Sequence, residues 1–101
     1  MNKIALVTGG SRGLGREMAI NLAKKGIDVI LTYHSNESAA KEVISEIEKN
    51  GQRAKAFQLD SSSISTFDAF FKKVSAYLQN EYQTTHFDYL INNAGTGIYT
   101  P

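Results

Sequence analysis

The chain has 101 residues, of which 42% are hydrophobic and 10% aromatic, so its composition fits one small packed domain and argues against two. Its 11 Lys and Arg residues nearly cancel its 10 Asp and Glu residues, which argues against a nucleic-acid partner. The sequence has no cysteine for a disulfide, a thiolate metal site or a nucleophile, and no signal-peptide core or membrane-spanning run, so we expect a cytoplasmic protein without a membrane partner.

The first elements expected are two strands with a helix between them. Residues 3–7 and 27–33 are short, mainly apolar runs, the second rich in β-branched side chains, and both predict strands buried on two faces. Between them Leu14, Met18 and Leu22 recur at four-residue steps. The sequence KKG then places basic residues and a glycine where a helix would end. The region therefore predicts a strand, a helix and a second strand.

The same alternation continues along the rest of the chain. Apolar residues at helical spacing predict a helix that ends at the KNG of residues 49–51, and residues 54–60 predict a third strand. Aromatic and aliphatic residues between 64 and 78 mark a third helix, and residues 87–92 predict a fourth strand. Alternating strands and helices are typical of parallel strands joined by helical crossovers, which makes this an α/β chain.

A glycine-rich segment, VTGGSRGLGRE at residues 7–17, leaves the first strand and opens the first helix. Such a loop gathers free backbone N–H groups at the positive end of the helix dipole, which suits a phosphate group. A tight structural turn needs only one glycine, so Gly9, Gly13 and Gly15 together favour phosphate binding. The loop is not a Walker A motif, because Arg-Glu stands where Lys and Ser or Thr are needed, and its spacing differs from G-x-G-x-x-G.

Two motifs resemble those of the short-chain dehydrogenase/reductase family. The cofactor loop T-G-x-x-x-G-x-G is present as Thr8, Gly9, Gly13 and Gly15, and the later motif N-N-A-G occupies residues 92–95. The resemblance covers the whole chain and implies a Rossmann-type, doubly wound parallel sheet with strand order 3-2-1-4. With that order, the right-handed crossover rule puts the first two helices on one face of the sheet and the third on the other. Both motifs then meet at the switch point of the sheet.

The resemblance also implies which residues bind the cofactor, which is NAD or NADP. Asp60 ends the third strand, where a family carboxylate accepts a hydrogen bond from the adenine amino group; capping of the next helix is the other role open to it. Asn92 is expected near the cofactor ribose, whereas Asn93 could equally well only bridge backbone groups. The expected cofactor-binding residues are Gly9, Ser11, Arg12, Gly13, Leu14, Gly15, Tyr33, His34, Ser35, Asp60, Ser61, Asn92, Ala94 and Gly95.

The end of the second strand bears on the choice between the two cofactors. NAD-selective proteins of this type carry an acidic residue there, but this chain has Tyr33, His34 and Ser35, and the next carboxylate is that of Glu37. Arg12 stands where many NADP-preferring members have a basic residue, and its guanidinium can bind the ribose phosphate, with His34 or Ser35 as a further donor. A solvated loop charge is the alternative for Arg12. We expect NADP, with NAD as the alternative.

The chemistry of the family requires a tyrosine followed four residues later by a lysine, and none of the 5 tyrosines of this chain has that neighbour. We therefore assign no catalytic residue, and we expect no metal site because no histidine and carboxylate cluster has ligand spacing. Residues 1–101 are expected to be a partial Rossmann domain, the inactive cofactor-binding portion of a longer oxidoreductase acting on a small carbonyl or alcohol. The alternative is a stand-alone nucleotide-binding or interaction module. An unpaired fourth strand also predicts self-association.

Overall fold

The computed structural model describes residues 3–9, 13–59 and 65–92. The predicted alternation of strands and helices is confirmed throughout these residues. The elements are β1 (Ile4–Thr8), α1 (Gly13–Lys24), β2 (Asp28–Tyr33), α2 (Glu37–Lys49), β3 (Ala54–Gln58), α3 (Ser65–Tyr82) and β4 (Tyr89–Asn92).

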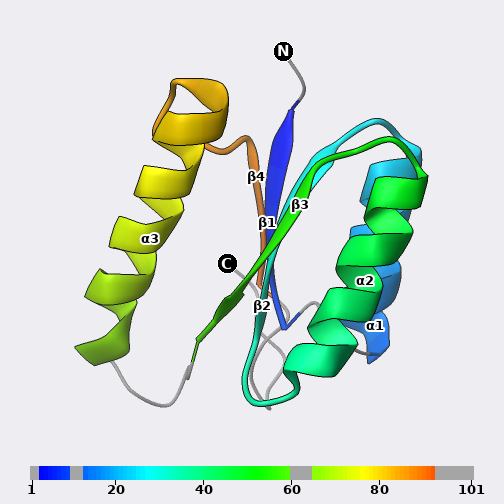
Figure 1. Ribbon diagram of the computed structural model, residues 1–101, viewed down its shortest axis with the longest axis horizontal. Coiled ribbons are helices and arrows are strands. Elements are labelled where there is room, and N and C mark those ends of the chain that lie inside the picture. The colour runs from blue at the N-terminus through cyan, green and yellow to red at the C-terminus, as the bar shows by residue number, and fades with distance from the viewer. Residues whose placement is uncertain (1–2, 10–12, 60–64, 93–101) are drawn as a thin grey trace.

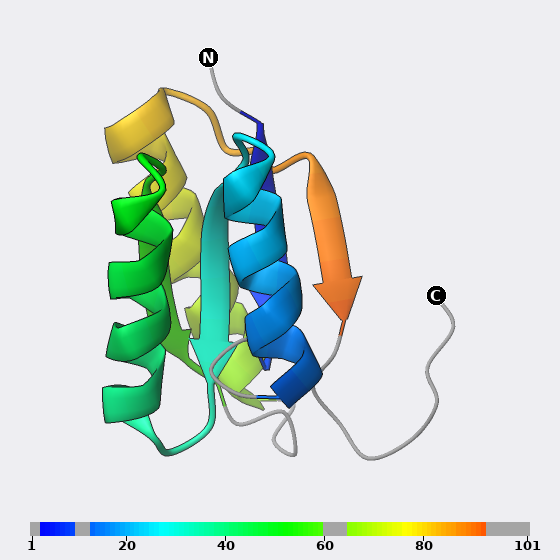
Figure 2. The ribbon, with the colours of Figure 1, turned by 90° about the vertical axis from the view of Figure 1, so that its right-hand side faces the viewer.

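The four strands form one parallel sheet in the order β3-β2-β1-β4, which confirms the predicted strand order. Helices α1 and α2 cover one face of the sheet and α3 covers the other, as the crossover rule predicts (Figure 1). On their shared face α1 and α2 lie side by side (Figure 2). The sheet is therefore doubly wound, as expected for a Rossmann-type arrangement.

Two apolar clusters, one on each face of the sheet, form the core. Because side chains alternate along a strand, Leu6 and Ile30 face α3 whereas Val7, Val29 and Leu31 face α1 and α2. Helices on both faces bury all four residues from Ile4 to Val7, which confirms that this strand is buried on two faces.

Three boundaries differ by two residues or more from those predicted. Helix α3 continues to Tyr82 rather than ending near residue 78, because the Tyr82 side chain is buried at 4% exposure and hydrogen-bonded. Strand β4 begins at Tyr89 rather than at residue 87, and the preceding Asp88 clamps it to β1: its backbone N–H donates to the Ile4 carbonyl, and its Oδ2 accepts from the Ile4 N–H. Strand β3 ends at Gln58 rather than at residue 60.

A buried carboxylate joins three elements at the amino ends of the strands. Asp28, at the start of β2, is 1% exposed. Its Oδ1 accepts hydrogen bonds from Gln52 Nε2 at 2.8 Å and from the Arg53 backbone N–H at 3.0 Å, and its Oδ2 accepts one from Tyr82 Oη at 2.6 Å. Burial raises the pKa of the Tyr82 hydroxyl far above its ordinary value, and the hydrogen bond to Asp28 raises it further. This network ties β2 to the turn before β3 and to the end of α3.

Candidate functional site

The carboxyl ends of β1, β2 and β4 lie at one edge of the sheet, where open α/β sheets bind their ligands. Thr8, the last residue of β1, is the register partner of Asn92, the last residue of β4. The first residue of the glycine motif therefore lies beside the first residue of the N-N-A-G motif. The two motifs, whose first residues are 84 positions apart in the chain, thus begin side by side on neighbouring strands, as the strand order implies.

The turn after β1 has backbone angles that favour glycine. Gly9 has a φ of 67° and Gly13 a φ of 61°, both in the left-handed region that other residues rarely adopt. A Cβ at Gly13 would meet no atom within 4 Å, so the backbone angle rather than lack of space favours glycine there. Gly15 is buried within the first turn of α1, and that turn contains no acidic residue. The positive end of the helix is therefore not offset by a carboxylate of its own first turn.

Leu14, in the first turn of α1, is exposed although the sequence pattern predicts it on the apolar face of the helix. Leu14 belongs to the four-residue repeat that predicted the helix, yet it is 62% exposed. The small residues Ala19 and Ala23 carry the buried face of α1 instead. Leu14 is therefore an exposed apolar side chain beside the glycine loop rather than a core residue.

Thr32 is a residue of this region that the sequence interpretation missed. Its side chain is buried, and its Oγ1 accepts the backbone N–H of Gly9 at 2.9 Å. On the other side of β1, Thr8 Oγ1 donates to the carbonyl of Ile91 at 3.4 Å. A threonine within the apolar run IDVILTY was the available signal.

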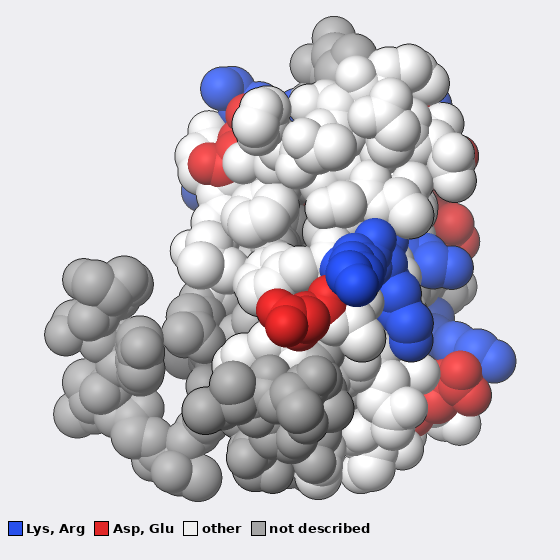
Figure 3. Space-filling model, turned by 90° about the vertical axis from the view of Figure 1, so that its left-hand side faces the viewer, with Lys and Arg blue, Asp and Glu red and all other residues white. Residues whose placement is uncertain are grey.

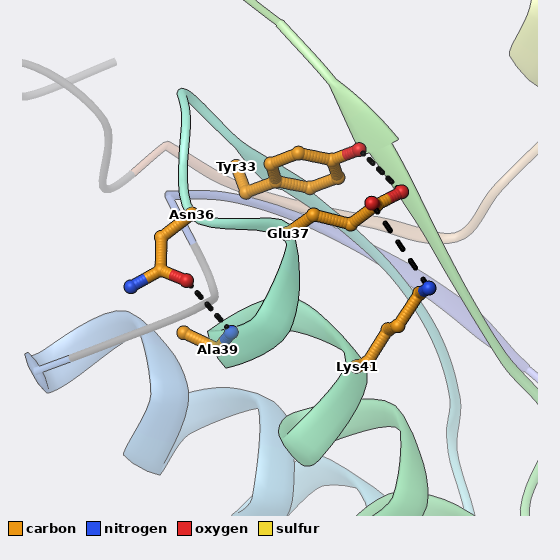
Figure 4. Close-up of polar contacts among 5 residues, drawn as sticks. All are labelled: Tyr33, Asn36, Glu37, Ala39 and Lys41. Atoms are coloured by element: carbon orange, nitrogen blue, oxygen red, sulfur yellow. Dashed lines mark hydrogen bonds and ion pairs between the residues drawn. The ribbon is translucent and has the colours of Figure 1, made fainter.

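The segment that follows β2 is short and exposed. Tyr33 is half-buried, and His34 and Ser35 are exposed. Helix α2 then begins at Glu37, and Asn36 caps it by accepting the Ala39 N–H with its side-chain oxygen at 3.0 Å (Figure 4). The cap fixes where the strand ends and the helix starts.

A carboxylate does reach the end of β2, although it comes from α2. The carboxylate of Glu37, the first residue of α2, contacts two side chains: Oε2 lies 3.5 Å from Tyr33 Oη, and Oε1 lies 4.0 Å from the ammonium of Lys41 (Figure 4). Burial raises the pKa of the Tyr33 hydroxyl above its ordinary value of 10.0, and the nearby Glu37 carboxylate raises it further. The four-residue spacing of Glu37 and Lys41 on the predicted helix was the signal in the sequence for their ion pair.

Tyr33 also lines a groove of about 360 Å³ between α2 and β3, together with Glu37, Lys41, Ile44 and Ala56. Its ring therefore lies against α2 and β3. Residues 34–36, which are exposed, connect it to the start of α2.

The remaining predicted site residues lie at the end of β4 or outside the described part of the chain. Asn92 is placed only as the end of β4. The predicted residues that lie outside the described part of the chain are Ser11, Arg12, Asp60, Ser61, Ala94 and Gly95. Their roles stay predictions. In the described residues no group of three His, Cys, Asp or Glu side chains could hold a metal ion, and no described helix is both long and apolar enough to cross a membrane.

Comparison with known proteins identifies the family. The family model for short chain dehydrogenases matches residues 3–101. Hydroxynaphthalene reductase-like protein Arp2 from Metarhizium guizhouense (strain ARSEF 977) is 36% identical over 99 residues, which cover 98% of this chain and 35% of that protein. The chain thus spans about a third of the length of this curated relative.

Two solved structures show the same likeness in space. The angucycline C-6 ketoreductase LanV, solved with bound NADP, has a TM-score of 0.88 at 38% identity, over 93% of this chain and 37% of that chain. The acetoin dehydrogenase from Enterobacter cloacae has a TM-score of 0.81 at 34% identity, over 100% of this chain and 38% of that chain. With the family model matching nearly every residue, the chain belongs to the short-chain dehydrogenase family.

Proposed function

We propose that this chain forms the NADP-binding portion of an oxidoreductase that interconverts a carbonyl and an alcohol. The observation that carries the proposal is that Gly9, directly after β1, and Gly13, the first residue of α1, both take left-handed backbone angles. Such a turn suits a dinucleotide pyrophosphate, because backbone N–H groups and the helix dipole both favour an anion. The similarity to LanV, a ketoreductase solved with bound NADP, supports the choice of cofactor.

The residues of the chain bind and orient the cofactor, and bound NADPH would supply the hydride that reduces a carbonyl carbon. The first turn of α1 favours the pyrophosphate electrostatically, and the residues after β2 lie where the adenosine ribose would be held. We assign the pyrophosphate to Gly9, Ser11, Gly13, Leu14 and Gly15, the ribose phosphate to Arg12, Tyr33, His34 and Ser35, the adenine to Asp60 and Ser61, and the second ribose to Asn92, Ala94 and Gly95.

The charge at the end of β2 supports NADP over NAD. No residue from Tyr33 to Asn36 carries a carboxylate, and the carboxylate of Glu37 is paired with Lys41. A free carboxylate there would repel the ribose phosphate and would accept hydrogen bonds from the ribose hydroxyls of NAD instead. The Glu37–Lys41 pair leaves the local charge close to neutral, and Arg12 adds a positive charge.

We propose that the 101 residues alone do not transfer hydride. No tyrosine of the chain is followed four residues later by lysine, and the chain spans 35% of the length of its relative Arp2. The groups that move protons at the substrate, and the pocket that selects a small carbonyl or alcohol, would belong to a longer protein. The chain alone should bind cofactor and leave it unchanged.

Self-association of the chain is a further part of the proposal. Within the described residues β4 pairs only with β1, and Tyr89 and Leu90 are 42% and 56% exposed. On the α3 face, much of the surface is neither acidic nor basic, and Phe71 of α3 is 49% exposed (Figure 3). An exposed strand edge that carries apolar side chains favours pairing with a second copy.

Calorimetric titration tests the cofactor assignment. The folded chain should bind NADPH weakly, and Arg12→Ala should weaken NADPH by about tenfold while changing NADH much less, because it removes a charge-assisted hydrogen bond to the ribose phosphate. Circular dichroism confirms that each protein is folded. No heat with millimolar NADPH would contradict cofactor binding, and equal losses for both cofactors would contradict the role of Arg12.

A further inference from the structure

Thr32 is an unusual residue for its position in the fold. It is 2% exposed, and the residue before it, Leu31, is a fully buried aliphatic side chain. An apolar residue would fill this place without a buried hydroxyl, and burying a hydroxyl is unfavourable unless it is hydrogen-bonded. The hydrogen bond that Thr32 makes therefore indicates why a polar residue is accommodated.

The partner of Thr32 is the first glycine of the loop. The parallel pairing of β1 with β2 ends at Val7 and Leu31, so Thr8, the last residue of β1, is no longer paired with β2. The next backbone N–H, that of Gly9, donates to Thr32 Oγ1 at 2.9 Å. The threonine side chain thus takes the place of a backbone acceptor where the ladder stops.

This hydrogen bond acts on a residue with a left-handed backbone conformation. Gly9 has a φ of 67°, and a turn through the left-handed region sets the direction in which the following loop residues leave the sheet. Thr8 remains paired with β4 through Asn92, so the turn is held from both neighbouring strands. The contact from β2, at 2.9 Å, is shorter than the hydrogen bond from Thr8 Oγ1 to the Ile91 carbonyl, at 3.4 Å.

We propose that Thr32 is a positioning residue for the cofactor site: its hydroxyl oxygen holds the Gly9 turn in the conformation that presents the glycine loop to the pyrophosphate. This inference rests on the proposed function. Thr32 acts through Gly9 and is not itself a catalytic residue. Because β2 is paired with β1 from Asp28 to Leu31 and with β3 from Val29 to Tyr33, loss of one side-chain hydrogen bond should loosen the turn while the strand stays in place.

The test compares variants of Thr32 in the 101-residue chain. Thr32→Val keeps the shape of the side chain and removes the acceptor, so NADPH binding should weaken by about three- to tenfold. Thr32→Ser keeps the hydroxyl and should bind NADPH within about twofold of the unsubstituted chain. Ile30→Val, on the same strand but in the cluster facing α3, is the control for a general loss of stability.

A ligand without a pyrophosphate separates positioning from a merely structural role. Adenosine has neither the pyrophosphate nor the 2′-phosphate that Arg12 of the glycine loop is proposed to bind, so its affinity should be the same for Thr32→Val and for the unsubstituted chain. Amide exchange gives a second readout. In the unsubstituted chain the Gly9 N–H should exchange well below the rate of a free amide, and in Thr32→Val it should exchange faster.

Each outcome decides a different point. NADPH affinity that Thr32→Val leaves unchanged, or lowers no more than Ile30→Val does at matched stability, overturns the positioning role. An unprotected Gly9 amide in the unsubstituted chain overturns it even if Thr32→Val does not fold. No NADPH binding by the unsubstituted chain overturns the proposed function and this inference with it.

Discussion

Glu37 sets how much negative charge stands at the end of β2. Its carboxylate lies between the Tyr33 hydroxyl and the Lys41 ammonium, and the ion pair is exposed, with 64% of the Glu37 side chain and 75% of the Lys41 side chain accessible. Exposed pairs of this kind contribute little to stability and are weakened by salt. The pair therefore matters more for the local potential that a bound phosphate meets than for the fold.

Removing the Glu37 carboxylate should improve binding of the phosphorylated cofactor. We expect Glu37→Gln to tighten NADPH by about two- to fivefold at low salt and to leave NADH nearly unchanged, because only NADPH brings a second negative group to this place. Titration of both cofactors at two salt concentrations measures the effect.

The matched control is Glu46→Gln, on the same helix. Glu46 is also ion-paired, with Lys49 at 3.4 Å, and lies nine residues further along α2, about 14 Å along the helix axis. If both variants tighten NADPH equally, net charge rather than the position of Glu37 is responsible. An equal gain for NADH would also contradict the assignment.

Single residues show why parts of the site could not be predicted. The glycine motif and the N-N-A-G motif, separated by most of the chain, could still be placed together, because the resemblance to the short-chain dehydrogenase/reductase family implies the strand order. The hydrogen bond from Gly9 to Thr32 depends instead on where the pairing of β1 and β2 stops, which hydrophobic periodicity does not record. The turn of Glu37 toward Tyr33 is likewise a choice of side-chain conformer.

At the scale of elements, the Asp28 network explains why α3 is longer than its apolar pattern indicates. Tyr82 reaches Asp28 across 54 residues, so the last turn of α3 is stabilised by a residue of β2. Arg53 adds a second tie, with its guanidinium 5.1 Å from the centre of the Tyr82 ring and one N–H donated to the Glu81 carbonyl. A helix end defined by distant contacts is invisible to local sequence patterns.

The same network predicts how stability depends on alkaline pH. The pKa of Tyr82 is raised in the folded chain, first by burial and then by Asp28, so above pH of about 10 the unfolded chain loses this proton before the folded chain does. Stability from this group is complete below that pH and falls as pH rises, by up to about 1.4 kcal/mol per pH unit.

Urea unfolding between pH 8 and 11.5 measures this dependence. Tyr82→Phe should lower stability by about 1–3 kcal/mol at pH 8, because Asp28 loses a donor, and should flatten the alkaline decline. Tyr89→Phe, at an exposed position on β4, is the control and should keep the decline. Parallel curves for Tyr82→Phe and the unsubstituted chain would show that Tyr82 does not cause it.

At the scale of the whole molecule, the two edges of the sheet differ in character. The β3 edge carries Lys55 and Gln58 as exposed residues, and Lys55 lies 5.8 Å from the centre of the Phe57 ring. The opposite edge, β4, exposes Tyr89 and Leu90 instead. Charged side chains on an edge strand oppose pairing with another chain, so association is favoured at β4.

Leu90→Lys should therefore weaken self-association of the chain by at least about tenfold, because it places a charge in the apolar contact. Light scattering over a range of concentrations measures the change, with circular dichroism to verify folding. Leu14→Lys makes the same change at another exposed leucine, on α1, and should not affect association. A monomer at every concentration, or association that Leu90→Lys leaves intact, would refute pairing through β4.

The length of β2 separates the Asp28 network from the proposed cofactor site. Asp28 is its first residue and Tyr33 its last, about 17 Å apart along an extended strand. Sites at that distance with no shared partners respond to substitution additively. Substitutions that raise stability around Asp28 and substitutions that change the proposed cofactor preference beyond Tyr33 could therefore be selected independently. When they are combined, their effects should add.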